Sequence, residues 1–244
     1  MKKEIIFESL KLIKNCNLSP TLSTRTKYKK IVKFAYKKFG KHIKKFINYN
    51  HFALEFNQEF FFKNYLKNLY FYDHLYNLGY RPNSNILDVG CGAAPASIAL
   101  YQLASIYKES TDLPQIHLID KSYRQLDLAR LMGRTASIPL KSARKEVFIF
   151  RETLYNEMLV FSYFVSEQER SFIKTLYSNR NSLKYGFAVI DYKYIVDRIK
   201  KTFDENGDHG IHVFYLHINL PTEFSNFLNE NEIHIYGCYY ENAT

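Results

Sequence analysis

The residues best suited to chemistry lie in a short segment, "NILDVGCGAAP", that begins at residue 85. An apolar run ends there at Asp88, and two glycines, Gly90 and Gly92, follow with one residue between them. Glycine lets the backbone approach a ligand closely, and a helix that begins after such a turn presents free N–H groups and a positive dipole end. Pro95 suits the first position of that helix. The segment therefore predicts a strand, a glycine turn and a helix that bind a nucleotide-like ligand.

This segment resembles the first motif of class I S-adenosylmethionine-dependent methyltransferases, an acidic residue followed by x-G-x-G, and the resemblance covers about residues 80–240. It implies that the glycine turn lies against the methionine and ribose part of S-adenosylmethionine, and that Asp88 orients that part. Asp120, which ends the run "IHLID", would accept the ribose hydroxyls. Many members have a third glycine where this chain has Ala94, which leaves a weakened or lost cofactor site as an alternative. The implied cofactor-binding residues are Asp88, Gly90, Cys91, Gly92, Asp120, Lys121, Ser122 and Ser162.

The candidate catalytic residues follow the expected fourth strand of the sheet, in "MLVFSYFVSEQE". Open α/β sheets bind ligands at the carboxyl ends of their strands, which places this segment beside the transferred methyl group. Most of the acceleration of an in-line methyl transfer can come from positioning, so a strong base is not required. If the acceptor is an oxygen or a protonated amine, a base would help. We take Tyr163 and Glu167 as the candidates, with Glu167 as the base.

Two of these segments also have a purely structural interpretation. Ser166 and Glu169 have the S-x-x-E spacing of a capping box, and Ser122 and Gln125 have the related S-x-x-Q spacing. Each pair would begin the helix that follows it. Tyr163 is as well suited to packing as to reaction.

Motifs that the chain lacks narrow the reaction further. There are no adjacent prolines and no Pro-Cys pair, which argues against an Asp/Asn-Pro-Pro-Tyr site for exocyclic base amines and against cysteine attack on a pyrimidine carbon. No metal site is predicted, because strand alternation places His212 and His217 on opposite faces of a strand. These two residues and His209 are interpreted as ordinary strand histidines. The cysteines lack the number and spacing of a disulfide set or zinc site and are interpreted as reduced thiols: Cys16, Cys91 and Cys238.

The positive charge is concentrated in the first third of the chain. The net charge is +10, yet residues 1–81 contain 17 Lys and Arg against 5 Asp and Glu, whereas residues 82–244 contain 17 against 19. This asymmetry indicates a polyanionic partner for one segment. We predict a basic helical domain over 1–81, which grips the substrate or covers the site, and a methyltransferase domain over 82–244. The candidate substrate-binding residues are Lys37, Lys38, Lys41, Lys44 and Lys45.

The order of predicted elements indicates an α/β fold. Apolar residues at intervals of three and four predict a basic amphipathic helix over 28–47 and a long helix or helix pair over 52–78. Strands are expected near 85–90, 115–120, 146–151, 158–163, 185–191, 210–218 and 232–239. Helices are expected near 95–108, 122–133, 166–179, 192–203 and 221–229. The alternation predicts a Rossmann-like, seven-stranded mixed sheet with helices on both faces, preceded by an all-helical basic segment. The resemblance implies that the last two strands form an antiparallel hairpin.

Charge and motif together favour an RNA methyltransferase that uses S-adenosylmethionine. Basic side chains interleaved with aromatic ones can contact phosphates and stack on unpaired bases. The layout is similar to that of the aminoglycoside-resistance methyltransferases of ribosomal RNA. The alternatives are a small-molecule or peptide methyltransferase with the helical segment as a lid, and a non-catalytic RNA-binding factor. The longest apolar runs are far shorter than the roughly 18 to 20 residues of a membrane span, and we expect a cytoplasmic protein without a membrane partner.

Overall fold

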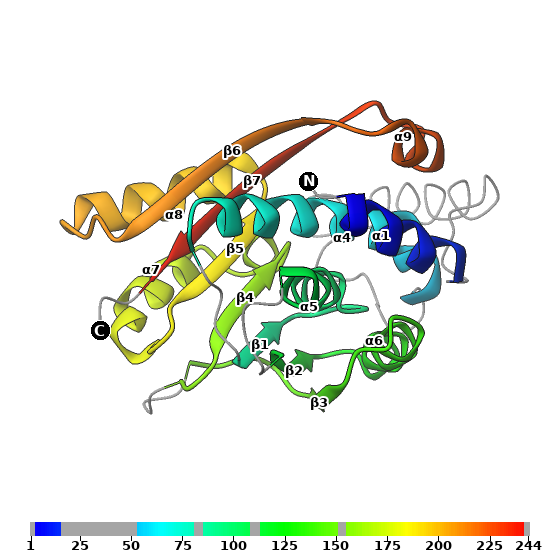
Figure 1. Cartoon of the computed structure of the whole chain (residues 1–244). Coiled ribbons are helices and arrows are strands. Elements are labelled where there is room, and N and C mark those ends of the chain that lie inside the picture. The colour runs from blue at the N-terminus through cyan, green and yellow to red at the C-terminus, as the bar shows by residue number, and fades with distance from the viewer. Residues whose placement is uncertain (1–2, 16–52, 81–84, 108–112, 151–154, 242–244) are drawn as a thin grey trace, which may run out of the picture.

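The computed structural model describes residues 3–15, 53–80, 85–107, 113–150 and 155–241 (Figure 1). The predicted basic helix over 28–47, with the five candidate lysines, lies outside these residues. The helices are α1 (Lys3–Asn15), α4 (Ala53–Asn77), α5 (Pro95–Tyr107), α6 (Tyr123–Thr135), α7 (Ser171–Ser178), α8 (Lys193–Glu205) and α9 (Thr222–Leu228). The strands are β1 (Asn85–Val89), β2 (Gln115–Asp120), β3 (Leu140–Lys145), β4 (Met158–Ser162), β5 (Phe187–Asp191), β6 (Ile211–Asn219) and β7 (Glu232–Tyr240).

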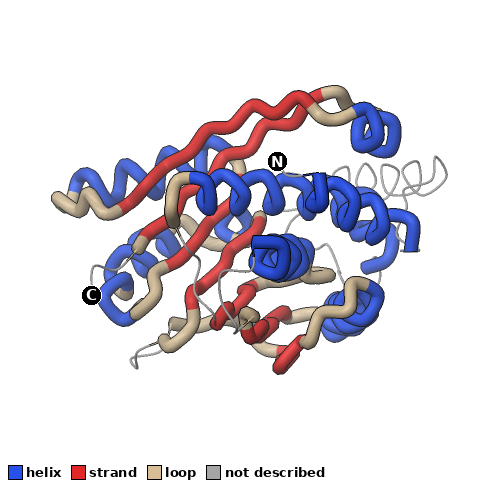
Figure 2. Tube along the Cα trace, in the orientation of Figure 1, coloured by secondary structure: helices blue, strands red, loops and turns tan. Residues whose placement is uncertain are grey.

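The seven strands form one mixed sheet in the order β3-β2-β1-β4-β5-β7-β6 (Figure 2). The first five strands are parallel to one another, and β7 runs antiparallel to both β5 and β6. The strand order reverses between β1 and β4, where open α/β sheets bind their ligands. The structure therefore confirms the predicted Rossmann-like fold and the hairpin formed by its last two strands.

Side chains alternate along the central strands between two hydrophobic layers. Ile86, Val160 and Ile190 pack against α4 and α5, whereas Leu87 and Val189 pack against α7 and α8 on the other face. Strands buried on both faces are apolar at nearly every position, as "MLVFS" and "FAVID" are. Each strand is thus held from both sides, and its carboxyl end has a fixed place.

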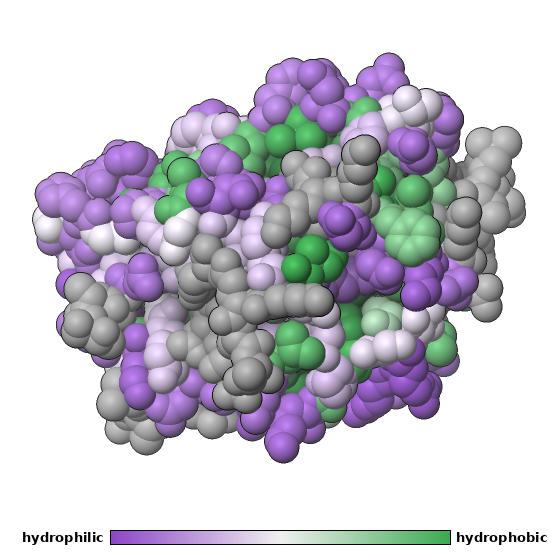
Figure 3. All heavy atoms as spheres, in the orientation of Figure 1, coloured by the Kyte–Doolittle hydropathy of each residue, from purple (hydrophilic) through white to green (hydrophobic). Residues whose placement is uncertain are grey.

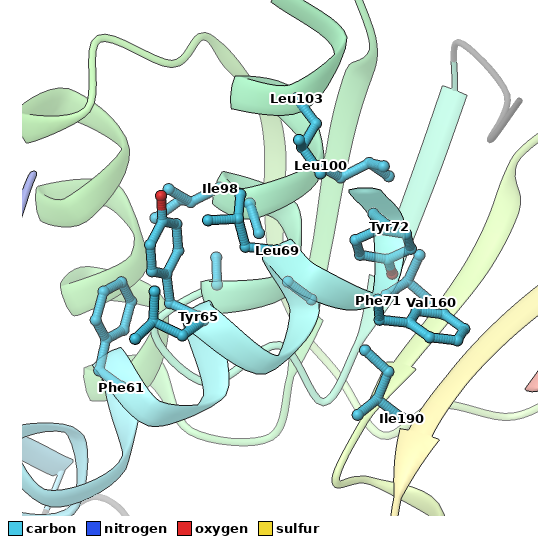
Figure 4. Close-up of a cluster of buried hydrophobic side chains, with 14 of the residues drawn as sticks. Phe61, Tyr65, Leu69, Phe71, Tyr72, Ile98, Leu100, Leu103, Val160 and Ile190 are labelled. Carbon is cyan, nitrogen blue, oxygen red and sulfur yellow. The ribbon is translucent and has the colours of Figure 1, made fainter. Parts of the chain in front are cut away.

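Helix α4 shares the core of the sheet (Figure 4). Phe61, Tyr65 and Leu69 lie against residues of α5 such as Ile98, and Phe71 points to the sheet. A methyl group at Gly237 of β7 would lie 2.5 Å from the Phe71 ring, so glycine at this position leaves room for the ring. Because α4 and the sheet form one hydrophobic cluster, the helix is a layer of the fold. The basic helical domain over 1–81 stays a prediction, and residues 16–52 of it lie outside the described residues.

Helix α1 lies in the segment predicted to be all-helical, although the sequence analysis assigns no helix to residues 3–15. Its Leu12 joins the core of α4 and α5, and the Ser9 hydroxyl lies 2.8 Å from the hydroxyl of Tyr65. Tyr65 in turn donates to Gln102 of α5 over 2.5 Å. Hydrophilic residues predominate among the described residues on the face shown in Figure 3. None of the helices within the described residues is both long and apolar enough to cross a membrane.

Two predicted elements are wrong. The third strand is β3 at 140–145 and not 146–151, because the polar sequence "LKSARK" pairs with β2 at the edge of the sheet. Edge strands carry charged side chains, so an apolar run is a poor guide to them. The helix predicted over 166–179 is divided into a 3₁₀ turn, Val165–Glu167, and α7, which begins at Ser171 without a side-chain cap. Ser166 and Glu169 therefore do not form a capping box for α7.

Candidate functional site

A cavity of about 260 Å³ lies at the carboxyl ends of β1, β2 and β4. The glycine turn supplies Gly90, Cys91 and Gly92, and the end of β2 supplies Asp120 and Lys121. The other walls come from α4, from residues 146–148, and from the end of β4 and the segment after it, which supply Ser162, Tyr163, Phe164, Glu167 and Gln168. The cavity thus brings together six of the eight residues predicted to bind the cofactor and both candidate catalytic residues.

The turn between β1 and α5 has a left-handed backbone at alternate positions. The φ angles are 65° at Gly90, 54° at Gly92 and 63° at Ala94. The N–H groups of Gly90 and Cys91 both donate to the carbonyl oxygen of Ile119, over 2.8 and 3.1 Å. Glycine adopts such φ angles without the strain that a Cβ atom adds, whereas Ala94 bears it. The frequent third glycine of the resembled motif thus coincides with a left-handed position in this chain.

Gly90→Ala should lower the free energy of unfolding by about 2–4 kcal/mol. A Cβ atom at Gly90 would lie 2.2 Å from Cδ2 of Phe164, whose ring is held between Phe161 and Phe172. In a Phe164→Ala background the same change should cost only about 1 kcal/mol, because the backbone strain remains and the clash is gone. Urea denaturation of the four proteins measures the difference.

Gly207→Ala is the matched control, because Gly207 has a φ of 71° and a Cβ atom there would meet nothing within 4 Å. Equal costs at Gly90 and Gly207 would contradict the close packing of Phe164 on the glycine turn.

Asp120 joins the glycine turn to the start of α6. Its Oδ2 accepts the N–H of Gly92 over 3.0 Å, and its Oδ1 accepts the N–H of Ser122 over 2.7 Å. Burial raises the pKa of the carboxyl, although these two N–H groups oppose that effect. The carboxylate lines the cavity with a fixed orientation, as the predicted hydrogen bonds to ribose hydroxyls require.

Ser122 has a capping role. Its hydroxyl accepts the N–H of Gln125 over 3.2 Å, which confirms it as the N-cap of α6. The reciprocal half of the predicted capping box is wrong, since the Gln125 side chain accepts from Asn57 of α4 over 2.6 Å. Ser122 does not line the cavity, whereas Gln125 and Asn57 do.

Asp88 also lies outside the cavity lining. Its carboxylate is buried, and Oδ2 accepts the hydroxyl of Ser97 in α5 over 2.6 Å. Oδ1 has no hydrogen-bond partner among the described residues. Burial, as the largest cause, raises the pKa of Asp88 to about 7, and the hydrogen bonds to Ser97 act against this rise. The structure thus places Asp88 between β1 and α5, beneath the residues predicted to contact the cofactor.

The segment after β4 is linked to α4 by polar contacts. The Asn68 amide donates to the Ser162 hydroxyl over 2.9 Å, and the Lys67 ammonium donates to the Tyr163 hydroxyl over 2.8 Å. Burial lowers the pKa of Lys67 to about 8, and the neighbouring charge of Lys63 adds to this shift. Tyr163 has a φ of 57°, a strained conformation that concentrates at functional sites.

The loop that carries Glu167 is anchored to the next strand. Asp191, at the end of β5, accepts the N–H of Ser166 over 2.9 Å and that of Tyr192 over 2.8 Å. Glu167 lines the cavity and is exposed, so a carboxylate there has access to solvent and to a bound molecule. Burial raises the pKa of Tyr163, and the nearby charge of Asp191 adds to the rise, so its hydroxyl is protonated at neutral pH.

The wall contributed by α4 was not identified from the sequence. Phe56, Phe60 and Phe61 line the cavity together with the amides of Asn57 and Asn64. The sequence predicts a long helix or helix pair over 52–78, within a segment that binds RNA or forms a lid. Helical periodicity shows that such residues share a face, but it does not show which part of the sheet that face meets.

Several of the solved structures similar to this chain are those of methyltransferases with different acceptors. The plantazolicin methyltransferase BpumL, in complex with S-adenosylhomocysteine, is 13% identical, with a TM-score of 0.49, and the match covers 90% of this chain and 99% of that one. Magnesium protoporphyrin IX methyltransferase from Synechocystis, with bound S-adenosylmethionine, is 11% identical, with a TM-score of 0.44 over 75% and 84% of the two chains. The ribosomal protein L11 methylase from Lactobacillus delbrueckii is 10% identical, with a TM-score of 0.45 over 73% and 78%. Neither a protein-family model nor a curated protein sequence matches the chain.

Proposed function

We propose that this protein is an S-adenosylmethionine-dependent methyltransferase. The observation that carries the proposal is the position of Asp120, whose carboxylate lines the cavity and is held at once by Gly92 of the glycine turn and by Ser122 of α6. A ligand with a vicinal diol and a short charged arm would place the diol at Asp120 and the arm along the turn. The motif at 85–95 and the strand order at this site agree with that assignment.

The residues of the cavity fit such a cofactor. Its volume of about 260 Å³ is close to the lower end of the roughly 300–1,000 Å³ that ligand pockets occupy. A Cβ atom at Gly92 would meet only Gln125 Oε1, at 3.8 Å, so the backbone there has no closer neighbour outside the turn. Phe148 and Phe164 provide apolar surface in the same cavity as Asp120. The site therefore combines a hydrogen-bond acceptor for hydroxyls with walls suited to an aromatic base.

The chain's own groups would bind and position the reactants. S-adenosylmethionine, when bound, supplies an electrophilic methyl group on a sulfonium. Each oxygen of Asp120 accepts one backbone N–H and retains lone-pair capacity for a hydroxyl. Tyr163 accepts from Lys67 and keeps its own O–H to donate to an acceptor molecule. Glu167 would take the proton from an acceptor oxygen or a protonated amine, and positioning would supply most of the acceleration.

RNA is the acceptor that we propose. Support comes from the charge of the chain, because residues 1–81 have a net charge of +12 whereas the rest has −2. A strongly basic segment lowers the free energy of binding to a polyphosphate through counterion release. The candidate lysines at 37–45 precede α4 in the sequence, and residues of α4 line the cavity.

Neutralising the basic segment should remove salt-dependent RNA binding. Replacement of Lys37, Lys38, Lys41, Lys44 and Lys45 by glutamine should make the negative slope of log K against log salt shallower by about 4, because each phosphate contact contributes roughly 0.7–0.9 to its magnitude. Fluorescence anisotropy with labelled RNA at several salt concentrations measures the slope.

The matched control neutralises five exposed lysines of the sheet domain, Lys174, Lys184, Lys193, Lys200 and Lys201. It should leave the slope nearly unchanged. Equal losses in both variants would show that charge alone, and not this segment, attracts RNA.

A second candidate acceptor is a small molecule or peptide, and the α4 wall favours it. The ring centroids of Phe56 and Phe60 lie 5.0 Å apart. Both rings line the cavity, as do Asn57 and Asn64. Rings and amides together suit a planar polar ligand. Radiolabelled methyl transfer to total RNA and to a small-molecule extract separates the two acceptors: label that is found only in the extract would replace RNA by the second candidate.

A further inference from the structure

The hairpin of β6 and β7 carries a polar ladder on one face. Three pairs of directly opposed residues follow one another along it: Tyr215 with Tyr236, His217 with His234, and Asn219 with Glu232. The intervening side chains, such as Leu216 and Ile235, face the core on the side of α4. The ladder therefore belongs to the opposite face, and it is separate from the cavity described above.

Three side chains of this ladder converge on one point. His217 Nε2 lies 2.7 Å from Oε2 of Glu232, and His234 Nε2 lies 3.6 Å from Oε1 of the same carboxylate. The two imidazole rings are stacked, with centroids 4.5 Å apart and planes inclined by 18°. Both Nε2 atoms thus approach one carboxylate, each at a different oxygen.

These atoms match the donor set of a divalent transition metal. Two imidazole nitrogens and one carboxylate bind Zn²⁺ at about 2.0–2.2 Å, which places tetrahedral ligands about 3.4 Å apart. The ligand atoms of His217, Glu232 and His234 all lie within 4.8 Å of one another. All three side chains are about half exposed. Rotation about their side-chain bonds can therefore bring the ligand atoms from this spacing to the tetrahedral one without disturbing the core.

The neighbouring tyrosines pack beside one of the ligands, and the site stays open to solvent. The Tyr236 ring stacks beside His234, with centroids 6.5 Å apart, and lies 6.0 Å from the Tyr215 ring. The Tyr215 hydroxyl donates to Asp197 of α8 over 2.6 Å. Helix α8 covers this face of the hairpin as far as Tyr215, and its first residue, Lys193, lies over that ring. His217 follows Tyr215 in β6, and His234 precedes Tyr236 in β7. Both therefore lie in the part of the hairpin nearer α9 (Figure 1).

We propose that His217, Glu232 and His234 form a binding site for a divalent transition metal, with Zn²⁺ as the fitting ion. Three protein ligands leave at least one coordination position for water or for a group of another molecule. The bound metal would join β6 to β7 close to the segment 220–231 that connects them. Neutral imidazoles bind metal through Nε2 with the proton on Nδ1, and that state requires release of the hydrogen bond from His217 to Glu232.

Zinc titration of the full chain tests this site. Protein without a polyhistidine tag, in a Cys16→Ser background, should bind one Zn²⁺ by calorimetry, and the ion should raise the thermal midpoint because it binds the folded hairpin. His217→Ala, His234→Ala and Glu232→Gln should each weaken Zn²⁺ binding at least tenfold. Cobalt should give the visible absorption of a tetrahedral ion, and EDTA should reverse it.

His212→Ala is the matched control, since His212 lies in the same strand and contacts Tyr80 on the other side of the hairpin. It should bind Zn²⁺ as the unmodified chain does. The thermal midpoint of each ligand variant without metal is measured as well, and we expect it to equal that of the unmodified chain. A loss of binding at an unchanged midpoint does not result from unfolding. Absence of one-to-one binding, or unchanged affinity in the His217→Ala, His234→Ala double variant, would overturn the proposal.

Discussion

Asp120→Ala should lower the affinity for S-adenosylmethionine at least about 100-fold, or about 2.7 kcal/mol of binding free energy. The change removes the carboxylate that would accept the ribose hydroxyls. It also leaves the N–H groups of Gly92 and Ser122 without their acceptor, so the turn and the start of α6 lose a common anchor. Hydrogen bonds to a charged group contribute about 1.5–3 kcal/mol each. The loss of the hydrogen bonds to two ribose hydroxyls is therefore enough to produce the expected decrease in affinity. Calorimetric titration measures it.

Two further variants identify the cause of that loss. Asp120→Asn keeps one acceptor oxygen and should have an intermediate affinity. Asp127→Ala removes an exposed aspartate of α6 that pairs only with Arg130 among the contacts described, and it should bind like the unmodified chain. Affinity in Asp120→Ala within threefold of the unmodified protein would place the cofactor elsewhere.

Asp88→Asn should stabilise the protein at pH 8 by up to about 4 kcal/mol and leave its stability at pH 4 nearly unchanged. The pKa of Asp88 is raised from 3.8 to about 7, chiefly by burial. The folded chain therefore retains a proton that the unfolded chain releases, and stability is lost as pH rises from about 4 to about 7. An asparagine does not ionise, and its oxygen can still accept the Ser97 hydroxyl. Urea denaturation between pH 4 and pH 8 measures the difference.

The same variant separates two roles for this residue. If Asp88 only joins β1 to α5, as its contact with Ser97 indicates, Asp88→Asn keeps its affinity for S-adenosylmethionine. If it orients the cofactor, as the motif implies, the affinity falls while the stability at pH 8 rises. A difference between the two proteins that does not change with pH would contradict the raised pKa.

The sheet could be predicted because its central strands are continuous apolar runs that end in turn residues. β2 and β4 begin where the sequence indicated, and Pro95 begins α5 as expected. β3 could not be found in this way. Its residues are polar or half-buried at the edge of the sheet, whereas Val147 and Ile149 in the predicted strand are 73% and 75% exposed. Pairing with β2, a contact between distant residues, selects the edge strand.

Residues of the cavity lining could be predicted where backbone chemistry determines their position, and they were missed where packing does. Gly90, Gly92 and Asp120 follow from the turn and from the end of a strand, and the cavity contains all three. Strand alternation turns Asp88 toward Ser97, and helix capping occupies Ser122. The contact of Lys67 with Tyr163 joins residues 96 positions apart, and no local pattern indicates such a contact.

The measurement that tests the central claim most directly is calorimetric titration of the unmodified protein with S-adenosylmethionine and S-adenosylhomocysteine. We predict one site for each, with competition between the two. Absence of binding to either, in protein whose thermal transition shows that it is folded, would contradict the assignment of the cavity at the glycine turn.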